Sequence, residues 1–257
     1  MTRRLAGLAV ALVATLSLVL AACGSPPAAP ALTDPKEILA KAVTSLSGVK
    51  TLDFTGTFSG KVAAAQLGTF DLSGVSMSGA ADLGGRKAKL LIDAPNLLGT
   101  RLEAILVDDA AYLKVAGAPA MLGAFSADRY TKLPMSTGTA APLAQATDPA
   151  KLVAGLQAAL ALLPVQPAKA ADDRCGDADC YHLTLAMTGA QLQQVSGTAT
   201  GDGDVTLDLF TRKQDYRPAR LQVSIVSPEL GTIGMVIEVR YDVGVSISAP
   251  AANQIAP

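Results

Sequence analysis

The chain has 257 residues, of which 50% are hydrophobic but only 4% aromatic, and it contains no Trp. Its 21 basic and 22 acidic side chains give a net charge of −1, which argues against a nucleic-acid-binding protein, because no excess of basic residues is available to neutralise phosphates. One His and three Cys leave little material for most metal centres and acid–base sites. The composition favours a binding or structural role.

The start of the chain has the organisation of a bacterial lipoprotein signal peptide. Arg3 and Arg4 form a basic beginning, and the apolar run at residues 5–20 is shorter than the ~20 residues that a membrane-spanning helix needs. The run ends in the lipobox Leu-Ala-Ala-Cys, in which Cys23 becomes the lipidated first residue of the mature protein. The alternatives are an ordinary secretory signal or a membrane anchor with an incidental Cys. A Pro/Ala-rich tether follows, which is suited to holding a domain away from a bilayer.

The folded part is expected to open with a capped helix. Asp34 is placed to cap it, Pro35 suits its first turn, and Gly48 supplies the stop. A strand follows in which Leu52, Phe54 and Phe58 alternate with polar residues, as in a half-buried antiparallel strand. Further alternating strands are predicted near residues 70–77, 87–92, 101–107 and 112–115. Residues 116–147 are interpreted as a loop with one short helix around 121–125.

The second half repeats this plan. Asp148-Pro149 predicts a helix that ends before Pro164, and strands are predicted at 181–187, 205–210, 221–226 and 235–243, with a short helix or turn at 189–195. Two related halves would explain the repetition, although Asp-Pro is also a common way to begin a helix. Many consecutive antiparallel strands with few helices exclude a doubly wound parallel sheet. We therefore predict an α+β fold: a single large, strongly curved antiparallel sheet, or half-open β-barrel, with helices packed on its concave face.

No catalytic motif is present. His182 is the one imidazole of the chain, and the alternation of its strand places it with Thr184 on the polar side, which predicts a solvated histidine. Cys175 and Cys180 are expected to form a disulfide, because an exported protein is exposed to oxidation. The alternative is a metal site that uses both thiols, His182 and an Asp. We predict no enzyme activity, no cofactor and no metal.

The feature of the sequence that points to a function is its predicted apolar surface. The second helix has a broad Ala/Leu face, and the inward residues of the strands are small or aliphatic. Such a lining leaves either a cavity between helices and sheet or a plain close-packed core, and composition alone does not decide between them.

The order of motifs resembles the LppX/LprG-type lipoproteins of actinobacteria over residues 34–248. The resemblance rests on the lipobox, the tether and the segments DPKEILAKAV (34–43), ILVDDAAYLKV (105–115), RYTKLP (129–134), DPAKL (148–152), VTLDLF (205–210), PARLQV (218–223) and VIEVRYDV (236–243). The pair Cys175 and Cys180 is not part of that pattern, which suggests a divergent member. The resemblance implies a signal peptide (1–22), a tether after the lipidated Cys (23–33), a lipid-binding domain (34–250) and a C-terminal tail (251–257).

The resemblance also implies an apolar cavity that binds long-chain or multi-acylated lipids or glycolipids and carries them across the cell envelope. We assign to this cavity Phe54, Phe58, Ala88, Leu90, Ile92, Ala104, Leu106, Leu152, Leu156 and Leu160. The protein is then expected at the extracytoplasmic face of the cell membrane, held by a lipid anchor that includes palmitate, with a membrane lipid exporter as a candidate partner. One alternative function is a surface lipoprotein that acts as a non-catalytic interaction or structural module without bound lipid. The other is an unrecognised hydrolase, which would need Asp or Glu side chains that converge in a pocket with raised pKa.

Overall fold

The fold is described from a computed structural model, which covers residues 31–64, 68–97, 99–117, 129–134, 148–196, 203–228 and 231–257. Residues Thr33–Pro257 form one compact unit. The predicted signal peptide, Cys23 and the short helix predicted around residues 121–125 lie outside the described residues. No helix in the described part of the chain is both long and apolar enough to cross a membrane.

Two helices begin as their sequences predict. Helix α2 (Pro35–Ser45) is capped by Asp34, whose carboxylate accepts a hydrogen bond from the Lys36 amide, and it ends in the 3-10 turn η1 (Leu46–Gly48). Helix α4 (Pro149–Ala161) is capped in the same way by Asp148. Helix α5 (Gly189–Ser196) forms where a short helix or turn is predicted at 189–195. The structure also has a 3-10 turn, η3 (Ala252–Gln254), near the C-terminus.

The described residues build one 13-stranded antiparallel sheet. The first half of the chain supplies β1 (Thr51–Ala64), β2 (Gly68–Asp71), β3 (Ser76–Asp82), β4 (Lys87–Ala94), β5 (Thr100–Val107), β6 (Ala110–Ala116) and β7 (Thr131–Pro134). The second half supplies β8 (Ala168–Lys169), β9 (Asp173–Cys175), β10 (Ala178–Thr188), β11 (Asp204–Arg212), β12 (Pro218–Ser227) and β13 (Gly231–Tyr241).

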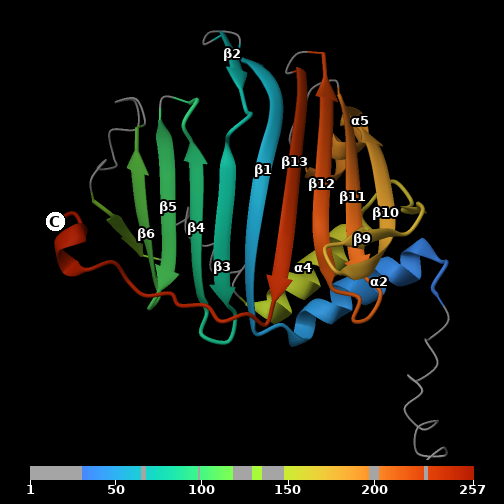
Figure 1. The fold of residues 1–257 in the computed structure, drawn as a ribbon, viewed down its shortest axis with the longest axis horizontal. Coiled ribbons are helices and arrows are strands. Elements are labelled where there is room, and N and C mark those ends of the chain that lie inside the picture. The colour runs from blue at the N-terminus through green and yellow to red at the C-terminus, as the bar shows by residue number, and fades with distance from the viewer. Residues whose placement is uncertain are drawn as a thin grey trace, which may run out of the picture. The chain divides into compact units, whose positions relative to one another are not determined.

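The two halves of the chain meet in the middle of the sheet. The strand order is β7-β6-β5-β4-β3-β1-β13-β12-β11-β10-β8, with β2 beside β1 and β9 beside β10. Each half is therefore a meander that follows its own capped helix, and β1 pairs with β13 at the join (Figure 1). The end strands β7 and β8 are not paired with each other, so the sheet is an open half-barrel, as the sequence predicts.

The main helix–sheet core lies at the β10 end of the sheet. Helix α2 packs against β10, and Ile38 and Leu183 are each 0% exposed there. Tyr216 links the same two elements, because it stacks on Tyr181 of β10 and lies under the Lys41 ammonium of α2. Helix α4 packs in turn against α2 and η1 (Figure 1).

The structure corrects the predicted loop at residues 116–147, because β7 lies inside it and pairs with β6. Strand β13 ends at Tyr241, two residues before the end of the strand predicted at 235–243, and the C-terminal residues 242–257 leave it and pass the ends of β3, β4 and β5 (Figure 1). We call residues 242–257 the strap. Its end is held by Tyr130, whose amide donates to the carbonyl of Gln254 and whose carbonyl accepts from the amide of Ala256.

Candidate lipid-binding face

Strand pairing places the predicted apolar residues on one side of the sheet. Phe54 is paired with Gly79, Gly79 with Leu90, and Leu90 with Ala104, and paired residues of antiparallel strands point to the same side. In the first half of the chain this side carries Leu52, Phe54, Gly56, Phe58, Met77, Gly79, Ala81, Ala88, Leu90, Ile92, Leu102, Ala104, Leu106, Ala111, Leu113 and Val115. We call it the apolar face.

The second half continues the apolar face without interruption. The registers of β13, β12, β11 and β10 add Met235, Ile237, Val239, Tyr241, Leu221, Val223, Ile225, Val205, Leu207, Leu209, Tyr181, Leu183, Leu185 and Met187. None of the residues named for either half is charged. Helix α2 lies on this side of β10, because Tyr216 stacks on Tyr181 of the apolar face and lies under the Lys41 ammonium of α2.

Burial is uneven across the apolar face. At the β10 end, where α2 packs on the sheet, Leu183 and Leu185 are 0% and 4% exposed. In the middle of the sheet, Phe54, Leu90 and Ile237 are only partly buried. Extended apolar patches are uncommon on the surface of soluble monomers and mark binding surfaces. The central strands therefore present apolar surface that the described helices leave partly uncovered.

The strand residues predicted to line a cavity all lie on the apolar face: Phe54, Phe58, Ala88, Leu90, Ile92, Ala104 and Leu106. The three helical residues predicted to line the cavity differ in how far they are exposed. Leu160 is partly buried, whereas Leu156 is 36% exposed, and the side chain of Leu152 lies outside the described residues. Lipid contact at all ten positions remains a prediction.

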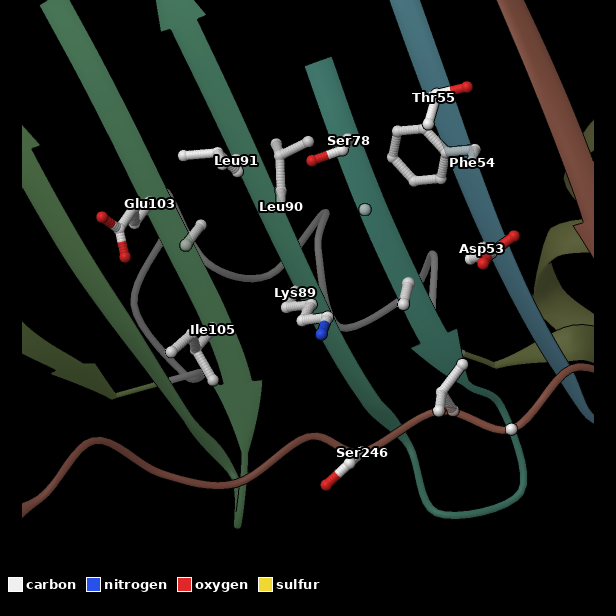
Figure 2. Close-up of a pocket in the computed structure, with 15 residues that line it drawn as sticks. Asp53, Phe54, Thr55, Ser78, Lys89, Leu90, Leu91, Glu103, Ile105 and Ser246 are labelled. Carbon is white, nitrogen blue, oxygen red and sulfur yellow. The ribbon is translucent and has the colours of Figure 1, made fainter.

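The opposite side, which we call the polar face, carries a groove of about 460 Å³ (Figure 2). It lies between strap residues Gly244–Ser246 and the side chains of β1, β3, β4 and β5. Its lining includes the charged residues Asp53, Lys89 and Glu103, together with Phe54 and Leu90 from the strands of the apolar face. Asp53 is paired with Arg240 of β13, with 2.9 Å between Oδ1 and Nε.

A hydrogen bond from Tyr130 holds Glu103, which lines the groove. The Tyr130 hydroxyl donates to Glu103 Oε2 at 2.7 Å and thereby holds the pKa of that carboxyl below its ordinary value. Burial, reinforced by the neighbouring carboxylate, raises the pKa of Tyr130 to about 12. Tyr130 also packs with Val107, Tyr112 and Ile255 in a small apolar cluster. This cluster secures the end of the strap.

The histidine prediction is partly wrong. His182 lies on the polar face as predicted, but it is not freely solvated: its side chain is 23% exposed, and Nε2 lies 2.8 Å from Asp208 Oδ1. Thr184 Oγ1 donates to the same carboxylate oxygen at 2.7 Å, and the Phe210 ring stacks on the imidazole. The alternation gave the correct face, but the carboxylate partner comes from the neighbouring strand β11.

The predicted disulfide is present. Cys175 and Cys180 are bonded across the β9–β10 turn, with their Cα atoms 6.0 Å apart. Both sulfurs are therefore committed to each other and cannot ligate a metal. Among the described residues, no group of three or more His, Cys, Asp or Glu side chains is placed to hold a metal ion.

Comparison with known proteins identifies the fold by structure alone. No family model matches the chain, and no curated protein sequence is significantly similar to it. LprF from Mycobacterium bovis superposes with a TM-score of 0.52 at 12% identity, covering 85% of this chain and 97% of LprF. The Mycobacterium tuberculosis lipoprotein LppX follows with a TM-score of 0.48 at 11% identity, covering 83% of this chain and 99% of LppX. The superposition on LprF shows that this chain shares the fold of that lipoprotein.

Proposed function

We propose that this protein is a lipoprotein that binds acylated lipids, glycolipids included, on its apolar face and carries them across the cell envelope. The observation that supports this is the uncharged apolar face, which stays partly uncovered in the central strands. Each CH₂ group moved from water to such a surface contributes ~0.8 kcal/mol. Several acyl chains can therefore bind tightly without polar recognition.

The location follows from the chain's beginning. The lipobox supports acylation of Cys23, which would hold the protein at the extracytoplasmic face of the membrane. The disulfide is consistent with an oxidising compartment outside the cytoplasm. The bilayer would then supply the lipid, with a membrane exporter as the candidate that loads it.

Two neighbouring leucines of β4 provide a matched test. Leu90 lies on the apolar face and is paired with the small residue Ala104, whereas the next residue, Leu91, has its side chain on the polar face, where it is paired with Glu103. Leu90→Trp should fill the space that acyl chains require. Leu91→Trp adds the same side chain to the same strand but on the opposite side of the sheet.

The measurement is the amount of lipid extracted per mole of protein from each variant after purification from an actinobacterial host. Leu90→Trp should lose most of the lipid that the wild type retains, and Leu91→Trp should keep it, while both keep wild-type circular dichroism. Equal lipid recovery from folded wild type and both variants would remove the apolar face as the binding site. It would favour the interaction module instead.

A further inference from the structure

Helix α4 has an unusual surface for a solvent-facing helix. Three large hydrophobic residues are exposed among those that the structure describes, and two of them belong to this helix and its C-cap: Leu156 is 36% exposed and Leu162 is 68% exposed. The third, Val226, lies on the polar face at the end of β12 and is 53% exposed.

Charge is missing where a solvated helix would carry it. Residues 152–168 contain no charged side chain, and Ala154, Ala158 and Ala159 are exposed together with the two leucines. The surface helices of soluble domains ordinarily place charged and polar residues on the side facing water. At its beginning, by contrast, α4 carries Lys151, which pairs with Asp148. The exposed surface of α4 is therefore suited to an apolar or interfacial environment.

We propose that α4 docks on the surface of the bilayer that holds the lipid anchor, with Leu156 and Leu162 inserted among the acyl chains. The proposal rests on the acylation of Cys23 in the proposed function. The segment from Cys23 to Pro35 spans at most about 40 Å when fully extended, so the bilayer lies within that distance of the first residue of α2. Helix α2 is the first described element after the anchor, and α4 packs directly against it, so α4 also lies near the point of attachment.

Docking through α4 would complete the transfer route. Helix α2 packs on the apolar face at β10 and α4 packs on α2, so a bilayer that contacts α4 lies on the side of the sheet where acyl chains are proposed to bind. A lipid could then pass from the bilayer to the apolar face without crossing the polar face. The anchor alone does not orient the domain, whereas the α4 contact does.

The absence of Trp permits a direct test. Leu162→Trp and Val226→Trp each introduce the chain's only Trp at an exposed hydrophobic position, the first on α4 and the second on the polar face. The acylated full-length protein is reconstituted in phosphatidylcholine–phosphatidylglycerol vesicles whose acyl chains are brominated. We expect quenching and a shift of emission to shorter wavelength for Leu162→Trp, and neither change for Val226→Trp.

Two further measurements separate this proposal from the proposed function. The mass of the Cys23 peptide reports acylation, and the lipid recovered from each variant reports binding to the apolar face. Titrating vesicles into residues 31–257, which hold the compact unit and lack both the signal peptide and Cys23, tests docking without the anchor, and there Leu162→Glu should weaken binding at least about tenfold relative to Val226→Glu. Equal quenching of the two Trp variants, or equal vesicle binding of the two Glu variants, would overturn docking through α4 even if the protein carries lipid.

Discussion

Gly79 of β3 is closely packed on the apolar face. A methyl group at this position would sit 2.4 Å from Phe54 Cζ and 2.8 Å from the backbone oxygen of Lys89. Neither distance is tolerated, and the backbone oxygen cannot move without distorting the β3–β4 pairing. Gly79→Ala should therefore displace the Phe54 ring and strain the sheet.

The expected cost is that of overpacking, about 1–3 kcal/mol of the free energy of unfolding. Gly56 of β1 supplies a matched control, because it lies on the same face and its added methyl would meet only the terminal Cε of Met77 at 2.9 Å and more distant atoms. The Met77 side chain is flexible, so Gly56→Ala should change the free energy of unfolding by less than about 1 kcal/mol.

The assay is urea denaturation of the mature chain with its disulfide intact, followed by circular dichroism. Gly79→Ala should lower the transition midpoint, and adding Phe54→Leu should restore part of it by removing the ring atoms nearest to the new methyl. Equal midpoints for wild type, Gly79→Ala and Gly56→Ala would refute the packing described for the apolar face.

Three other predictions concern stability. Leu183→Ala should cost about 2–5 kcal/mol of the free energy of unfolding, because Leu183 is completely buried under α2, and Leu90→Ala should cost clearly less in the same urea series. The pKa of Glu103 in the folded protein lies below its ordinary value of 4.5. The contribution of Glu103 to stability is therefore present above pH 4.5 and is lost as the pH falls through the lowered pKa of the folded state. Tyr130→Phe removes the hydrogen bond that lowers this pKa, so the urea midpoint of the variant should fall less steeply with decreasing pH. An unchanged acid decline would contradict the role given to the Tyr130 hydroxyl. Reducing the Cys175–Cys180 bond should lower stability by about 2 kcal/mol, as measured by urea midpoints with and without reductant.

Most of the fold could be predicted from short local patterns in the sequence. The two Asp-Pro helix starts need only neighbouring backbone amides, so Asp34 and Asp148 could be recognised as caps from their own segments. Strict alternation in β1, β4 and β10 fixed which residues share a face, since a one-residue shift would turn every side chain to the other side. The apolar face could therefore be predicted from strands read one at a time.

Features that depend on distant segments could not be predicted. The strap has no periodic pattern, and its position depends on Tyr130, which lies more than a hundred residues earlier in the chain. His182 obtains its partner from another strand, so its own alternation predicted only its face. The leucines of α4 look equivalent in the sequence, whereas contact with α2 and η1 leaves Leu162 exposed and Leu160 partly buried.

The central claim is that the apolar face binds acyl chains, and the mass of the intact protein tests it most directly. Residues 31–257, produced in the envelope of an actinobacterial host, are to be compared in native and denaturing mass spectra. The account predicts an additional mass, matching a multi-acyl lipid, that is present in the native spectrum and lost on denaturation. A native mass equal to that of the polypeptide alone, unchanged after host lipids are offered, would contradict it.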